Sequence, residues 1–92
     1  MFKVIDSVDT GKTKKLLEEC IRTNGVFVCK HPERVPAKCL SYGFDSVPIY
    51  MGYEEFLNKL GKQKFKRVYI DELEKFNLVL FDLEGYTITK ED

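Results

Sequence analysis

The sequence has no excess of either charge. Its 92 residues include 15 Lys and Arg and 15 Asp and Glu, so the formal net charge is zero. A strong general attraction to nucleic acid or to an anionic membrane is therefore not expected. Two local basic clusters are present, namely Lys12, Lys14 and Lys15, and Lys62, Lys64, Lys66 and Arg67. The second cluster keeps nucleic-acid binding open as a hypothesis.

The sequence also lacks a long apolar run. No stretch approaches the roughly 20 apolar residues that a membrane-spanning helix needs. The segment Met1–Asp6 has no signal-peptide pattern. These absences predict a cytoplasmic protein that does not use a membrane. A length of 92 residues without linker, repeat or low-complexity segment predicts a single domain over residues 1–92.

Cysteine is scarce and odd in number, since only Cys20, Cys29 and Cys39 are present. An odd count without a secretion signal argues against a disulfide framework. A structural zinc site needs four ligands, and His31 is the single histidine near these cysteines. We therefore expect three buried free thiols and no zinc site.

The sequence does contain a regular alternation of strand-like and helix-like segments. Strands are expected at Phe2–Ile5, Val26–Cys29, Val47–Met51, Arg67–Ile70 and Gly85–Thr89. Helices are expected at Lys12–Thr23, from Pro36 to Gly43, at Tyr53–Leu60 and at Glu72–Leu80. This order predicts an α/β fold with a small, mostly parallel sheet of about four to five strands and helices on both faces. Ligands of such sheets bind outside the carboxyl ends of the strands.

The run Asp9-Thr10-Gly11-Lys12-Thr13 follows the first expected strand and opens the first expected helix. A tight loop at this place aims backbone N–H groups and the positive end of the helix dipole at a phosphate. Gly11 permits close approach, Lys12 adds charge for the outer phosphates, and the Thr13 hydroxyl can hold Mg²⁺. The alternative interpretation is a solvated helix N-terminus whose lysines face water.

The loop departs from the pattern G-x-x-x-x-G-K-[ST] at its first position, where Asp6 stands in place of glycine. Asp6 and Asp9 also bring negative charge near a site for anions. At roughly 6–8 Å and an effective dielectric of about 20, each costs on the order of 2 kcal/mol before solvent screening. A loop that keeps its shape without its ligand is therefore an open alternative.

A second motif lies where the apolar run Val68–Ile70 ends in Asp71 and Glu72. Magnesium keeps most of its waters and takes one or two carboxylates, so Asp71 can hold it through water opposite Thr13. Glu72 is then the candidate base that orients the attacking water. The alternative is a helix N-terminus, which Asp71 caps and where Glu72 favours the helix dipole.

With these two motifs the chain resembles the P-loop NTPases, in particular the branch with Asp-Glu at its second motif. Thymidine kinases and helicase motor cores belong to that branch. Leu16–Cys29 followed by Lys30-His31-Pro32 is similar to the helix, second strand and following loop of thymidine-kinase-like proteins. The whole layout, through Gly85–Thr89, resembles small P-loop-like proteins of bacteriophage genomes.

The resemblance implies phosphate binding by Gly11, Lys12 and Thr13, magnesium at Thr13 and Asp71, and activation of water by Glu72. The chain is about half the usual length of the family. It also lacks an identifiable arginine finger and the cysteine quartet that holds zinc in many thymidine kinases. Thymidine kinase activity is therefore not expected.

Three functional hypotheses follow. The first is a minimal P-loop domain that binds ATP or GTP with Mg²⁺ and hydrolyses it slowly, with a partner or self-association completing the site. The second is a non-enzymatic phage or mobile-element protein that binds a host protein, such as a replication or defence factor. The third is a nucleic-acid accessory protein that uses the Lys62–Arg67 cluster.

Overall fold

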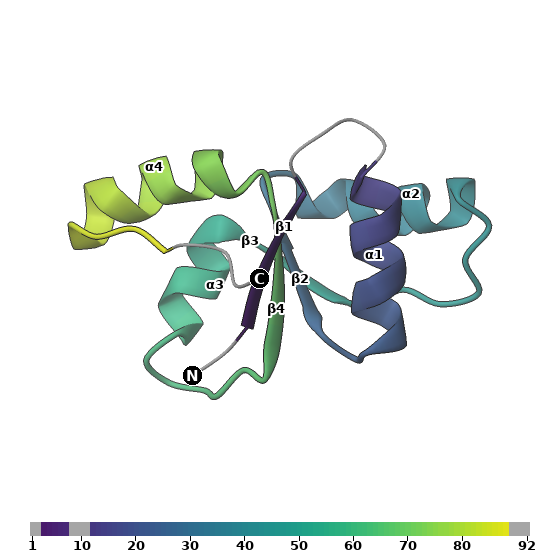
Figure 1. Cartoon of the computed structure of the whole chain (residues 1–92), viewed down its shortest axis with the longest axis horizontal. Helices are drawn as coiled ribbons and strands as arrows, with labels where there is room; N and C mark the ends of the chain where they lie inside the picture. Colours follow the sequence, from purple (N-terminus) through teal and green to yellow (C-terminus); the bar gives the residue numbers. More distant parts are fainter. Residues whose placement is uncertain (1–2, 8–11, 89–92) are drawn as a thin grey trace.

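The structure of the chain is a computed structural model that describes residues 3–7 and 12–88, with side chains from residue 13 onward. Strands and helices alternate along these residues (Figure 1). Their order is β1 (Lys3–Ser7), α1 (Lys12–Arg22), β2 (Val26–Cys29), the short 3₁₀ helix η1 (Pro32–Arg34), α2 (Val35–Ser41), β3 (Ile49–Gly52), α3 (Tyr53–Lys59), β4 (Arg67–Asp71) and α4 (Leu73–Glu84).

The strands form one open sheet in the order β1-β4-β2-β3, and every pairing in it is parallel. Helices α1 and α2 cover one face of this sheet, and α3 and α4 cover the other (Figure 1). The expected α/β fold, with a parallel sheet between two helical layers, is confirmed. Strands β1 and β3 are the two edges of the sheet.

The prediction of a fifth strand at Gly85–Thr89 is wrong for residues 85–88, which are the part that the structure describes. Residues 85–88 form no strand, and α4 runs on to Glu84 instead of ending near Leu80. Gly85 then adopts a left-handed conformation with φ 77°, which turns the chain back along the helix. The Asn77 side chain bonds both backbone groups of Ile88, at 2.7 and 2.9 Å. The alternating pattern of this segment therefore reflects packing of Ile88 against a helix, not pairing in the sheet.

The core lies on both faces of the sheet, and β4 supplies side chains to each. Val68 and Ile70 pack with α3 and α4, whereas Tyr69 points to the α1 side. This follows from the two-residue period of an extended strand. All three side chains are fully buried, as a central strand covered on both faces requires.

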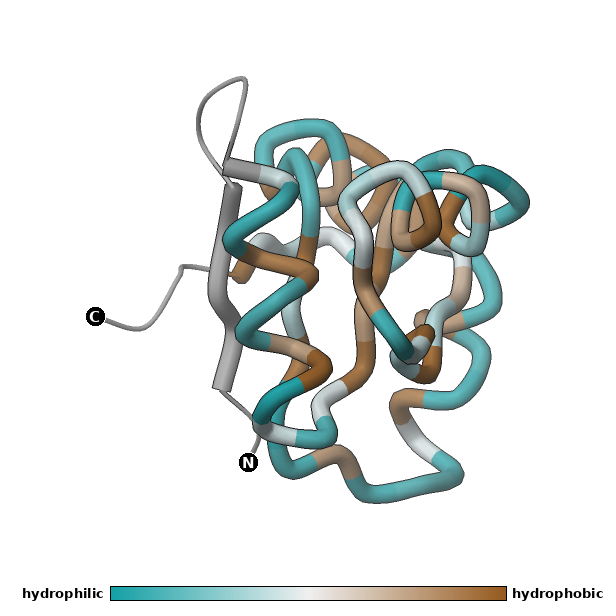
Figure 2. The backbone as a smooth tube through the Cα atoms, turned by 90° about the vertical axis from the view of Figure 1, so that its right-hand side faces the viewer, coloured by the Kyte–Doolittle hydropathy of each residue, from teal (hydrophilic) through white to brown (hydrophobic). Residues whose placement is uncertain are grey.

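Helix α1 shows the expected apolar stripe. Leu16, Leu17 and Cys20 are buried, while Lys14 and Glu18 are exposed. The same alternation is visible as brown and teal bands along α1 in Figure 2. No helix in the described part of the chain combines the length and the apolar character needed to cross a membrane.

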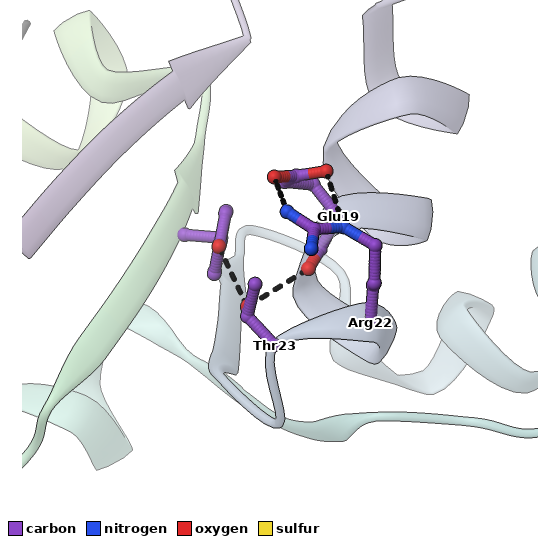
Figure 3. Close-up of polar contacts among 4 residues, drawn as sticks. Glu19, Arg22 and Thr23 are labelled. Atoms are coloured by element: carbon purple, nitrogen blue, oxygen red, sulfur yellow. Dashed lines mark hydrogen bonds and ion pairs between the residues drawn. The ribbon is translucent and has the colours of Figure 1, made fainter.

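The end of α1 is fixed by Thr23 and the two residues after it. Asn24 takes a left-handed conformation with φ 55°, and the Gly25 N–H bonds the Cys20 carbonyl at 2.9 Å. The Thr23 hydroxyl donates to the Glu19 carbonyl at 2.8 Å (Figure 3). Its oxygen lies 2.7 Å from the phenol oxygen of Tyr69, so this bond ties the helix end to β4.

Candidate functional site

The carboxyl ends of β1 and β4 lie side by side. The two strands are neighbours in the sheet, and their register pairs Ser7 with Asp71. The carboxyl end of β1, which precedes the predicted phosphate loop in the sequence, therefore lies beside the acidic end of β4, where ligands of parallel sheets bind.

Helix α1 begins at Lys12, directly after the predicted phosphate loop. Its first turn contains no acidic residue, and the side chains of Lys14 and Lys15 are exposed. Cations at the positive end of a helix dipole are unfavourable on their own, and a bound anion would offset this repulsion by attracting both the lysines and the dipole. The predicted site residues Asp9, Thr10 and Gly11 lie outside the described residues, as does the Lys12 side chain.

Asp71 is the buried acid of this edge. It is 9% exposed and ends a strand whose three preceding residues are fully buried. Its charge acts on Cys29, which ends the neighbouring strand β2. Burial raises the pKa of the Cys29 thiol to about 11, and the Asp71 carboxylate adds to that rise. Cys29 is therefore a neutral thiol and no nucleophile at neutral pH.

Glu72 has an unusual backbone for a residue with a side chain. Its φ and ψ are both 58°, in the left-handed region, and it is the N-cap of α4. The N-cap position of α4 is Glu72 and not Asp71, because the helix begins at Leu73, and Glu72 makes no side-chain capping bond. The Glu72 carboxylate is exposed and pairs with Lys75 at 3.1 Å. A strained residue beside a buried acid is typical of functional edges.

Tyr53 is a residue of this edge that the sequence does not reveal. It is the first residue of α3, and its hydroxyl donates to the backbone carbonyl of Asp71 at 2.7 Å. The same oxygen lies 3.3 Å from the carbonyl of Glu72. The ring packs edge-on against Phe76 at 5.3 Å. Sequence patterns indicate only that Tyr53 belongs to the core, which it does at 7% exposed.

The cysteines and the other possible metal ligands can be compared with the structure. The three cysteines are free and buried, as expected. Among residues 3–7 and 12–88, no group of three or more His, Cys, Asp or Glu side chains is arranged to hold a metal. A zinc site built from described residues is therefore absent, whereas Mg²⁺ needs only one or two carboxylates.

The Lys62–Arg67 cluster lies at the amino end of β4, at the opposite end of this strand from Asp71. Its four basic side chains are exposed, but Phe65, the single aromatic residue among them, is 7% exposed. Phe65 packs against Phe56 at 5.2 Å in the core. The cluster therefore offers charge without the exposed aromatic ring on which single-stranded bases stack.

No family model, curated protein or solved structure matches this chain. The functional interpretation therefore depends on the geometry of the carboxyl edge. That edge combines the start of α1, the buried Asp71 and the strained Glu72.

Proposed function

We propose that this chain is a minimal P-loop domain that binds the phosphates of ATP or GTP, with Mg²⁺, at the carboxyl ends of β1 and β4. The observation that carries the proposal is the pairing of Ser7 with Asp71 in neighbouring strands. The strand that precedes the Asp9–Thr13 run in the sequence therefore ends beside the acidic end of β4, which supports a shared site at that edge. A phosphate site and a magnesium carboxylate need that proximity.

The start of α1 supports the phosphate part of the proposal. The first N–H groups of a helix have no partner within the helix, and they carry the positive end of its dipole. Three of the first four residues of α1 are lysines, and the first turn of this helix contains no acidic residue. In the proposed complex, Gly11 lets the backbone approach the phosphates, and Lys12 pairs with the outer ones.

Thr13 and Asp71 support the magnesium part. Both belong to elements that meet at this edge, and Asp71 is a buried carboxylate. Two oxygen ligands suit an ion that keeps most of its waters. When bound, Mg²⁺ neutralises charge on the phosphates. Glu72, which directly follows Asp71, accepts the proton of the attacking water in a slow hydrolysis.

The test of binding is thermal and chemical unfolding with and without nucleotide. Millimolar ATP or GTP with Mg²⁺ raises the free energy of unfolding by about 2.7 kcal/mol at a hundredfold excess over Kd. Lys12→Ala abolishes this gain. Lys15→Ala is the matched control, because Lys15 is exposed on the same helix turn and has no proposed contact. A melting temperature unmoved by either nucleotide rejects the proposal.

The magnesium ligand is tested separately. Asp71→Asn removes the dependence of nucleotide affinity on Mg²⁺, which titration calorimetry with and without the ion measures. Asp82→Asn, an exposed change on α4, leaves that dependence intact. Phosphate release measured for Glu72→Gln then separates hydrolysis from binding, because this variant keeps the affinity and loses the turnover.

A further inference from the structure

A cavity of about 750 Å³ is lined by the first residues of α3, by α4, and by Lys30 and Pro32, which follow β2. We call it the α3–α4 groove. Leu78 and Val79 of α4 and Pro32 form apolar walls, and Lys30 and Glu54 stand at its sides. The groove is large enough for several side chains of a partner.

Helix α4 also carries apolar side chains that nothing in the described chain covers. Leu73, Phe76 and Leu80 are buried in the core, but Leu78, Phe81 and Leu83 are 70%, 59% and 62% exposed. The carboxyl-terminal half of α4 projects beyond the sheet (Figure 1). Leu78 and Phe81 are three residues apart and therefore neighbours on one side of the helix, and exposed apolar side chains that lie together mark an interaction site. The same helix thus presents protruding apolar side chains and one wall of an apolar groove.

We propose that the α3–α4 groove is the interface of a homodimer with two-fold symmetry, in which α4 of each copy lies in the groove of the other. In a two-fold interface the same patch meets itself, so a contact from one residue to another occurs twice. A surface with a protrusion beside a groove of its own chemistry satisfies that condition. Leu78 lines the groove and is 70% exposed, so in this dimer it contacts the partner copy.

The charges of the groove support a second copy as the occupant. Lys30 and Glu54 have opposite signs, and neither forms an ion pair with any residue between 13 and 88. The neighbouring Glu55 and Lys75 are already paired, with Lys59 and Glu72. A two-fold axis through the groove allows Lys30 of each copy to face Glu54 of the other. In the proposed dimer, opposite charges of the two copies therefore face each other.

Sedimentation velocity between about 1 µM and 1 mM tests the proposal. We expect a monomer–dimer equilibrium for the unchanged chain. Leu78→Asp raises the dimer dissociation constant at least about tenfold, which corresponds to roughly 1.4 kcal/mol. Leu40→Asp is the matched control, because Leu40 is 79% exposed on α2 and lies on the other face. It leaves the dissociation constant unchanged.

Charge reversal tests the pairing itself. Lys30→Glu and Glu54→Lys each weaken self-association, because like charges then face each other twice. An equimolar mixture of the two variants restores a dimer, since every cross-contact is again between opposite charges. Both changes are at the surface, and circular dichroism melts check that the variants are folded.

Three results overturn the proposal. The first is a monomer throughout the concentration range, which leaves the groove to a different partner. The second is a dimer that Leu78→Asp leaves intact or that Leu40→Asp weakens equally. The third is a mixture of the two charge variants that associates no better than each variant alone. None of these results depends on nucleotide binding, so the dimer and the proposed function are tested independently.

Discussion

The hydroxyl of Tyr53 donates a hydrogen bond to the backbone carbonyl of Asp71 across 2.7 Å. Tyr53 begins α3 and Asp71 ends β4, so this bond joins two elements that are separated by a loop. Asp71, where the chain turns from β4 into α4, is therefore bonded by the Tyr53 side chain of α3. The position of the buried acid is therefore set by α3 as well as by the strand.

Tyr53→Phe is expected to lower the free energy of unfolding by about 1 kcal/mol. The ring and its contact with Phe76 remain, and only the hydrogen bond to the carbonyls is lost. Urea denaturation followed by circular dichroism measures the change. Tyr42→Phe is the control, because the Tyr42 hydroxyl has no hydrogen bond with residues 13–88. Equal effects of the two substitutions would contradict the role of Tyr53.

Most of the architecture could be predicted because it depends on local patterns. Val26–Cys29 is a strand with the predicted bounds, and α1 ends at Arg22, one residue before its predicted end. Continuous apolar runs and an Asn-Gly helix end are signals contained in a few residues. The error at Gly85–Thr89 has the opposite origin. There, apolar and polar residues alternate, but Ile88 packs against the core and its backbone bonds the Asn77 side chain of α4. No local pattern specifies this contact.

The candidate site was predictable only in part. The carboxyl end of β4 was identified because an apolar run ended in acids. The neighbouring positions of β1 and β4 were not, since strand order depends on which helices cover which face of the sheet. The bond from Tyr53 and the left-handed backbone of Glu72 also depend on tertiary structure. The predicted residues Asp9, Thr10 and Gly11 stay predictions.

Substitutions of Glu72 test its backbone strain. A residue with a Cβ in the left-handed region is disfavoured by roughly 1 kcal/mol relative to glycine. We therefore expect Glu72→Gly to be about 1 kcal/mol more stable to urea than Glu72→Ala, although both lose the exposed pair with Lys75. Glu74, in the first turn of α4, is the control. There the order reverses, with alanine more stable than glycine, because helix interiors disfavour glycine.

Gly25, in the turn between α1 and β2, lies close to Tyr69 of β4. A Cβ at this position would lie 2.5 Å from Cε1 of Tyr69, a ring that is fully buried and bonded to Thr23. Gly25→Ala is expected to lower the free energy of unfolding by about 1–3 kcal/mol, as overpacking does. Gly61→Ala is the matched control, since nothing lies within 4 Å of its added Cβ. In thermal melts, we expect the melting temperature of Gly25→Ala to fall and that of Gly61→Ala to rise or stay unchanged.

The buried thiols predict a loss of stability at alkaline pH. Burial, with a smaller contribution from Cys39, raises the pKa of the Cys20 thiol from 9.0 to about 12. Below pH 9 the thiol is protonated in both states, so its contribution to stability is complete. As pH rises from about 9 to about 12, the unfolded chain releases the proton while the folded chain retains it. The free energy of unfolding therefore falls, by up to about 1.4 kcal/mol per pH unit from this thiol.

Urea titrations between about pH 8 and pH 11 measure the slope, and Cys20→Ala should flatten it even though the variant is less stable throughout. An unchanged slope in that variant would show that Cys20 is not the source of the alkaline loss.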